Sequence, residues 1–152
     1  MAINQKWQPK GPWNSKDVIA FLEETVIPIR LSAINSSGWP VIVSLWFVLD
    51  KDYIWCATSS TAKLAAIIRN NDKCAFEIAP DSPPYRGLRG QATATIDIDQ
   101  GANILSMLVD RYLKDRETEF ARWLLNREAS EIAIRIDPVK IQSWNYASRM
   151  RS

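Results

Sequence analysis

Three strand-like runs follow one another in the first half of the chain, with only short turn signals between them. They span residues 29–35, 41–49 and 53–58, and they are separated by Ser36-Ser37-Gly38 and by Asp50-Lys51-Asp52. Polar and glycine-containing clusters of this kind form tight turns. Two successive tight turns require antiparallel neighbours, because a parallel pair needs a much longer crossover. The chain is therefore predicted to form an antiparallel meander.

The rest of the chain alternates further strands with helices. The run 41–49 is apolar on both faces, which predicts a central strand. Four segments with apolar residues at helical spacing are predicted helices, at 14–24, 62–70, 101–114 and 118–126. Further strands are expected at 74–79, 85–98, 131–136 and 140–146, with Asp137-Pro138 dividing the last two. The expected architecture is mainly β, a six-stranded antiparallel barrel with about four helices, as one domain over 1–152 with an irregular N-terminal arm over 1–13.

Composition narrows the classes of partner and compartment. The 152 residues suit one domain, and 19 basic against 17 acidic side chains leave a net charge of only +2. Neither nucleic acid nor an anionic membrane is expected as a partner. The longest apolar run falls well short of the roughly twenty residues of a spanning helix. Two cysteines in apolar runs and a polar start without a signal core predict a cytoplasmic protein.

The chain contains no histidine. This excludes the Ser-His-Asp and Cys-His forms of nucleophilic catalysis and removes the commonest metal ligand. No metal site is expected, and no catalytic acid or base can be assigned from the sequence. Any redox chemistry would then come from a bound cofactor.

A hydroxyl-rich segment links the strand 53–58 to the next helix. It consists of Thr58, Ser59, Ser60 and Thr61, followed by Ala62 and Lys63. Unpaired backbone N–H groups at a helix N-terminus favour an anion, and a lysine in the first turn would suit a phosphate. An ordinary helix cap explains the same residues, since Ser and Thr are favoured there. Both interpretations stay open at this point.

Two further patterns have both a structural and a ligand-binding interpretation. Trp46 and Trp55 lie on neighbouring predicted strands and Trp144 lies on the last, where they could pack a barrel or a dimer interface, or form a wall for a planar ring. In the segment 85–92, Arg86 and Arg89 alternate with glycines. That pattern allows either close approach of a ligand or a solvated strand face with a bulge.

Taken in order, these segments resemble the pyridoxamine 5'-phosphate oxidase-like family of FMN-binding split barrels. The resemblance covers nearly the whole chain from Arg30 to Trp144. Its points of contact are Gly38-Trp39-Pro40, Val43-Ser44-Leu45-Trp46-Phe47, Trp55-Cys56-Ala57-Thr58, Arg69-Asn70-Asn71-Asp72 and Arg86-Gly87-Leu88-Arg89-Gly90-Gln91-Ala92.

The resemblance implies a split barrel that forms a homodimer, with two cofactor sites at the subunit interface. It implies that the ring system lies near Ser44, Leu45 and Trp46, and that a phosphate group is held by Thr58, Ser59, Ser60, Thr61 and Lys63. Ala57 also belongs to the cofactor-binding set. Tyr85 and Arg86 would lie near the site and could reach the partner's cofactor, as could Trp144. These twelve residues are the predicted cofactor-binding set.

The sequence departs from the family at several positions. Where the family often has Thr-x-x-x-Ser-x-Lys, this chain has Ala62 at the serine and Leu64 at the lysine, with Lys63 one place earlier. Ile42 and Phe47 stand near positions that are basic in the oxidases themselves. Vitamin B6 oxidation is therefore not predicted.

The resemblance instead implies an FMN-dependent oxidoreductase with a small-molecule redox substrate. The alternatives are an F420-dependent reductase, whose longer anionic tail would have to meet Arg30, Arg69, Arg86 or Arg89, and a cofactor-free split-barrel dimer without catalytic activity. Haem binding ranks third among the cofactors, since histidine is absent. A barrel that binds single-stranded nucleic acid is disfavoured, because Trp46 and Trp55 have apolar rather than basic neighbours.

Overall fold

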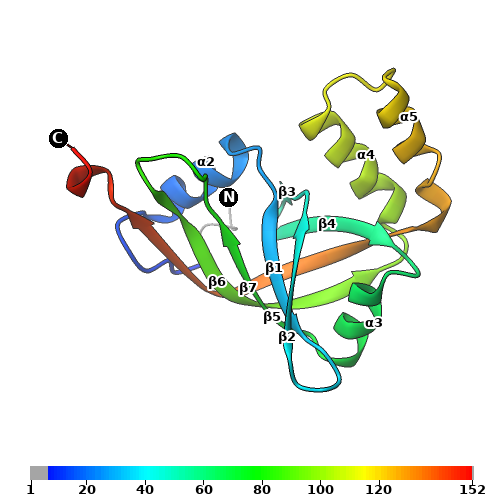
Figure 1. Ribbon diagram of the computed structural model, residues 1–152, viewed down its shortest axis with the longest axis horizontal. Coiled ribbons are helices and arrows are strands. Elements are labelled where there is room, and N and C mark those ends of the chain that lie inside the picture. The colour runs from blue at the N-terminus through cyan, green and yellow to red at the C-terminus, as the bar shows by residue number, and fades with distance from the viewer. Residues whose placement is uncertain (1–6, 152) are drawn as a thin grey trace.

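An antiparallel sheet dominates the computed structural model, which describes residues 7–151 (Figure 1). Within them the sheet has seven strands in the order β2-β1-β5-β6-β7-β4-β3. The mainly β, antiparallel fold predicted from the sequence is confirmed, with seven strands instead of six. Residues 1–6 of the predicted arm lie outside the described residues. The strands are β1 (Ile29–Ile34), β2 (Pro40–Leu45), β3 (Val48–Asp50), β4 (Tyr53–Ser59), β5 (Lys73–Ile78), β6 (Arg86–Asp97) and β7 (Glu131–Asn145).

The first predicted hairpin, β1–β2, is confirmed, and Asn35 builds its turn. The side-chain oxygen of Asn35 accepts hydrogen bonds from the backbone N–H groups of Ser37 and Trp39, both at 3.0 Å. Gly38 completes the turn with a φ of 83°, which glycine adopts without a steric penalty. The second hairpin, β3–β4, is confirmed as well, with Asp50 opposite Tyr53.

The prediction of one central strand over 41–49 is wrong, because this run forms two strands at opposite edges of the sheet. Only Trp46 and Phe47 connect β2 to β3. Such a connection spans at most about 10 Å, so the sheet has to curl until its two edges approach. Phe47, between the two strands, is fully buried inside the curled sheet, whereas Ile42 of β2 points outward and is 73% exposed, so the apolar run does not correspond to one buried strand.

The two predicted closing strands are a single strand, β7, and the expected break at Asp137-Pro138 is wrong. Gln91 of β6 pairs with Lys140, and Ala92 pairs with Pro138, so Val139 has no partner. The extra residue forms a bulge, which is where a strand accepts a proline that lacks an N–H group.

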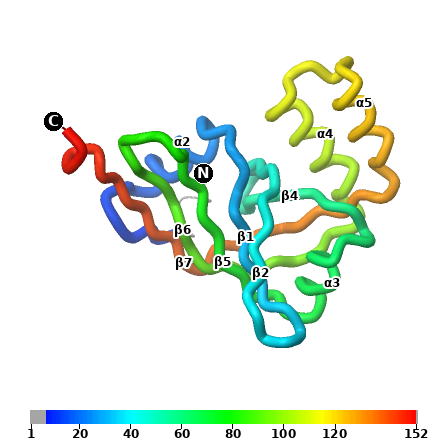
Figure 2. The backbone as a smooth tube through the Cα atoms, viewed as in Figure 1, coloured from blue at the N-terminus to red at the C-terminus, as the bar shows by residue number. Residues whose placement is uncertain are grey.

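All four predicted helices are present. Asn14 caps α2 reciprocally with Asp17, as in a capping box. Figure 2 shows α4 and α5 side by side at one end of the sheet and α2 towards the other end. The stripe of α4 that was predicted to be apolar is buried, and this helix packs on β4 and β7. The helices are α2 (Ser15–Glu24), α3 (Lys63–Asn70), α4 (Gly101–Tyr112) and α5 (Glu119–Leu125), with short 3-10 turns η1 (Glu128–Ser130) and η2 (Ala147–Arg149).

The core fills the inside of the curled sheet and continues under α2. Both cysteines belong to it and neither forms a disulfide. Burial raises the pKa of the Cys56 thiol, and burial with the nearby Asp72 carboxylate raises that of Cys74 to about 11, so both thiols stay protonated. Within residues 7–151, no helix is both long and apolar enough to cross a membrane.

Candidate functional site

A cleft of about 360 Å³ opens between the ends of β2 and β4 and the helices α4 and α5. β2 and β4 are separated by four other strands in the sheet, so it is the curl of the sheet that brings their ends together. Half of the predicted cofactor-binding set lines this cleft. These residues are Ser44, Leu45, Trp46, Ala57, Thr58 and Ser59.

Aromatic rings build one wall of the cleft. The ring of Trp46 is stacked on Tyr112, with centroids 4.8 Å apart and planes within 5° of parallel. Phe120 of α5 meets Trp46 edge-on at 6.4 Å and lines the cleft beside it. Stacked and edge-to-face pairs are the arrangements that aromatic quadrupoles favour. The plane of the Trp46 ring is therefore fixed from two sides.

The chain between β2 and β3 is held in place by one hydroxyl group. Tyr112 accepts a hydrogen bond from the backbone N–H of Phe47 at 3.1 Å and donates one to the carbonyl of Ile27 at 2.8 Å. Burial raises the pKa of Tyr112, so the hydroxyl keeps the proton that it donates. This link ties the backbone next to Trp46 to the segment between α2 and β1 and to the end of α4.

The neighbouring Arg111 ties α4 to α2. Its guanidinium donates to the backbone carbonyls of Leu22, Glu23 and Thr25 at 2.8–3.0 Å. It also lies 5.0 Å from the centroid of Phe47. These carbonyls belong to the end of α2, where the helix lacks internal partners for them and a cation is favourable.

The hydroxyl segment is only partly in the cleft. Thr58 and Ser59 line it, whereas Ser60, Thr61 and Lys63 are exposed and do not. The interpretation of these hydroxyls as a helix cap is wrong: the N-cap of α3 is Ala62, and no side chain caps it. The Ser59 hydroxyl instead accepts from the backbone N–H of Thr61 at 3.3 Å and shares a 3.0 Å hydrogen bond with its hydroxyl.

The structure adds lining residues that the sequence reasoning did not assign to the site. Four are apolar residues of the predicted helices. The sequence placed them on those helices but did not predict that they lie beside the cleft. The other two are Arg127 and Glu131, for which the sequence carried no signal. Burial raises the pKa of the Glu131 carboxyl, and the charge of Arg127 partly offsets this. The added residues are Leu105, Leu108, Phe120, Leu124, Arg127 and Glu131.

Tyr85, Arg86 and Trp144 do not line the cleft of the same protomer. They lie at the start of β6 and the end of β7, on the side of α2, where Arg86 lies 5.8 Å over the ring of Phe21. Trp144 stands opposite Gly87 and lies under the guanidinium of Arg89 at 4.9 Å. These three predicted residues are thus separated from the other nine, so they could serve a cleft only across a subunit interface.

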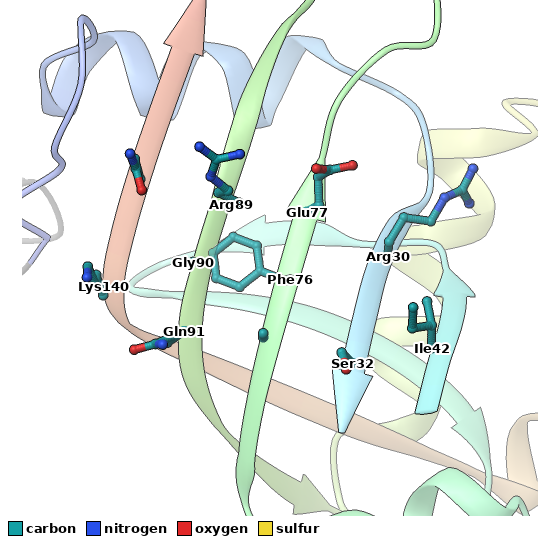
Figure 3. Close-up of a pocket in the computed structure, with 11 residues that line it drawn as sticks. Arg30, Ser32, Ile42, Phe76, Glu77, Arg89, Gly90, Gln91 and Lys140 are labelled. Atoms are coloured by element: carbon teal, nitrogen blue, oxygen red, sulfur yellow. The ribbon is translucent and has the colours of Figure 1, made fainter. Parts of the chain in front are cut away.

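A second hollow, of about 580 Å³, lies on the outer face of the sheet (Figure 3). Strand pairing aligns one row of residues across five strands, and these side chains share a face because neighbouring strands are in register. Within residues 7–151 no ion pair joins the charged members of the row. The row is Ser44, Arg30, Glu77, Arg89 and Gln142, and the next row is Ile42, Ser32, Ala75, Gln91 and Lys140.

No group of three or more potential metal-ligating side chains occurs within residues 7–151. The cleft described above has one aromatic wall, a strand end that carries hydroxyl groups, and one charged residue of each sign. It can orient a planar molecule and offer hydrogen bonds to it, but it presents no nucleophile with an activating base.

Comparisons with known proteins identify the architecture. No protein-family model and no curated protein sequence matches the chain. Among solved structures, a conserved hypothetical protein of Mycobacterium tuberculosis matches with a TM-score of 0.78 at 16% identity, covering 93% of this chain and 90% of that one. An F420 reductase matches with a TM-score of 0.67 at 21% identity, covering 79% and 92%. A candidate pyridoxamine 5'-phosphate oxidase of Listeria innocua matches at 0.63 and 18%, covering 84% and 95%.

Similarity at these identities establishes the fold and not the activity. The chain has the split-barrel fold of pyridoxamine 5'-phosphate oxidase-like proteins, as the resemblance in sequence implied. Proteins with this fold in the comparison include a haem storage protein of Vibrio cholerae, so the fold by itself does not select a ligand.

Proposed function

We propose that this protein is an FMN-binding oxidoreductase that holds its cofactor in the cleft between β2, β4, α4 and α5. One observation carries the proposal: Ser44, Leu45 and Trp46 meet Thr58 and Ser59 in one cleft, although their strands lie far apart in the sheet. A planar ring needs an apolar wall, and its phosphorylated tail needs hydrogen-bond donors at a distance from that wall. The cleft offers both.

Each part of the cleft has a role towards such a cofactor. Trp46 and Phe120 would pack against the ring and exclude water, and the backbone of the strand end at Ser44 would orient it. The hydroxyl groups of Thr58 and Ser59 would donate to the phosphate. Hydride transfer is the chemistry that a bound flavin supplies. The protein adds binding, orientation and a dry environment.

We extend the proposal to a homodimer joined through the outer face of the sheet. Ser44 belongs both to the cleft and to the row that crosses this face, so the two surfaces are continuous. Arg30, Glu77 and Arg89 alternate in sign along the row, and a two-fold axis that passes between Glu77 and one of these arginines would set each Glu77 against an arginine of the other copy. Ile42, 73% exposed on the same face, would be buried there.

The same row supports F420 as a second candidate cofactor. F420 carries a longer anionic tail than FMN, and two guanidinium groups against one carboxylate make the row starting at Ser44 a suitable path for it. The 21% identical F420 reductase shares the fold. A dimer that has kept the fold and lost the cofactor is the non-catalytic alternative.

The visible spectrum of the purified protein separates these proposals, with FMN and F420 titrated into colourless material. A flavin spectrum, or saturable binding of one cofactor followed by its reduction and reoxidation, supports the oxidoreductase. Replacement Trp46→Leu is expected to weaken FMN binding about 2- to 12-fold, the value of one aromatic contact. Trp39→Leu, at a position 71% exposed in the β1–β2 turn, is the matched control and should bind as the wild type does. Absence of binding by either cofactor would leave the cofactor-free dimer.

A further inference from the structure

The cleft contains one positive charge, and it is not the one that the sequence suggested. Of the twelve described residues that line the cleft, Arg127 is the single cation and Glu131 the single acid. Lys63 stands exposed at the first position of α3, outside the lining. An anion that enters the cleft would therefore meet Arg127 before any lysine.

The turn that carries Arg127 is fastened to the hydroxyl segment. The carbonyl of Arg127 accepts hydrogen bonds from the backbone N–H and the hydroxyl of Ser130, each at 3.0 Å. The carbonyl of Ser130 in turn accepts from the N–H of Ser60 at 2.8 Å. One residue further on, Glu131 pairs with Ser59 across the β4–β7 ladder. The backbone thus holds Arg127 beside the two hydroxyl residues that line the same cleft.

The guanidinium of Arg127 has its hydrogen-bonding capacity free. It lies 4.8 Å from the centroid of Trp123, and within residues 7–151 it forms no hydrogen bond and no ion pair. Arg122, on the preceding helix α5, differs, because it is paired with Glu117 at 2.6 Å. A half-buried guanidinium that rests on an aromatic face keeps its forked N–H donors for an oxyanion, and their geometry matches a phosphate.

We infer that Arg127 binds the phosphate group of the cofactor, in the cleft whose aromatic wall contains Trp46 and Phe120. This inference rests on the proposed function and adds the group that fixes the orientation of the cofactor in the cleft. Thr58 and Ser59 supply the neighbouring hydroxyl donors, and Arg127 supplies the charge. Glu131 lies in the same cleft and weakens the binding of any anion whenever its carboxyl is ionised.

The test compares FMN with riboflavin, which has the same ring and lacks the phosphate. Arg127→Met is expected to weaken FMN binding about 10- to 100-fold, as for loss of a charged hydrogen bond, and to change riboflavin binding by less than about 3-fold. Arg127→Lys keeps the charge but loses the forked pair of N–H donors, so its affinity for FMN should lie between those of the wild type and Arg127→Met. Glu131→Gln should change FMN binding in the opposite direction and tighten it. If the chain binds F420 instead, the matched pair is F420 and its phosphate-free deazaflavin core.

Two control variants make the outcome specific. Arg122→Met removes an arginine of α5 that is outside the cleft and should bind both ligands as the wild type does, and Lys63→Met should have a smaller effect than Arg127→Met. Equal loss of FMN and riboflavin in Arg127→Met, a larger effect of Lys63→Met, or unchanged FMN binding in a folded Arg127→Met would each overturn the inference and leave the proposed function standing. Failure of the wild-type chain to bind either cofactor would overturn both.

Discussion

Tyr112 joins two parts of the chain with a single hydroxyl group, at the point where the sheet edges meet. The residues between β2 and β3 belong to no strand, so the backbone N–H of Phe47 has no partner in the sheet. Tyr112 provides one and stacks on Trp46 at the same time. The geometry of the cleft wall thus depends on a residue that does not line the cleft.

Tyr112→Phe tests this dependence directly. The change keeps the stacked ring and leaves the Phe47 N–H and the Ile27 carbonyl without their partner, which should destabilise the fold by about 1–3 kcal/mol. Denaturant unfolding of the two proteins measures the difference. Tyr146→Phe, at a hydroxyl for which no hydrogen bond is formed within residues 7–151, should stay within about 0.5 kcal/mol of the wild type. An equal effect of both variants would contradict the role of the Tyr112 hydroxyl.

Glu131 gives the stability of the protein a pH dependence of defined sign. Burial raises the pKa of its carboxyl above the ordinary value of 4.5, and Arg127 lowers it in part. Folding therefore favours the protonated form. The contribution of the protonated Glu131 carboxyl to the stability of the fold is fully present below the ordinary pKa and is lost as the pH rises through the raised pKa. The melting temperature of Glu131→Gln minus that of the wild type should increase as the pH rises above 4.5 and should then become constant. Glu128→Gln, on the exposed turn η1, is the control, and a constant difference for Glu131→Gln would contradict the account.

At the scale of elements, the sequence correctly predicted the helices and strands whose apolar pattern results from packing against one surface. α4 was predictable because one stripe of it is buried against β4 and β7. The run 41–49 was not, since its apolar pattern comes from two strands on opposite edges, and only the closure of the sheet separates their environments. The hydroxyl segment suggested a phosphate site at a helix N-terminus. Arg127 could not be predicted as a site residue, because it lies on a turn whose sequence has no recognisable pattern.

The docking of α4 depends on its first residue. A Cβ atom on Gly101 would lie 2.0 Å from the backbone carbonyl oxygen of Glu131, so the helix can approach β7 only through a glycine. In an open helix, a change from Gly to Ala usually stabilises by about 1 kcal/mol. Gly101→Ala should instead destabilise by about 1–3 kcal/mol, because backbone has to move.

The comparison for this variant is Gly38→Ala. Its Cβ would meet nothing within 4 Å, and its cost comes only from the φ of 83°. Thermal unfolding of both variants with and without cofactor separates the effects. Gly101→Ala should also weaken cofactor binding, because α4 supplies Leu105 and Leu108 to the cleft, whereas Gly38→Ala should not. A stabilised Gly101→Ala protein would contradict this packing.

At the scale of the whole molecule, the predicted site residues fall at two ends of the sheet. The cleft lies beside α4 and α5, and Tyr85, Arg86 and Trp144 lie towards α2. In the homodimer that we propose, the second group would have to serve the partner's cleft. The sequence could suggest this assembly only through its resemblance to a dimeric family, since no single strand pattern shows which face a second copy covers.

Ile42→Lys tests the homodimer. Ile42 is 73% exposed on the outer face, so the fold of one protomer should accept lysine, while a two-fold interface would then bury a charge. Sedimentation analysis should show a dimer for the wild type and a monomer for the variant, with cofactor binding lost alongside. Ile98→Lys, with 68% exposure in the connection between β6 and α4, should remain dimeric. A monomeric wild-type protein that binds cofactor normally would contradict the shared site.

We propose that the cofactor occupies the cleft beside Trp46, and a crystal structure of the protein with FMN would show whether it does. We expect the flavin ring against Trp46 and Phe120, the phosphate between Ser59 and Arg127, and Tyr85 or Arg86 of a second copy nearby. A flavin bound in the hollow on the outer face of the sheet, with the cleft filled by water, would contradict it.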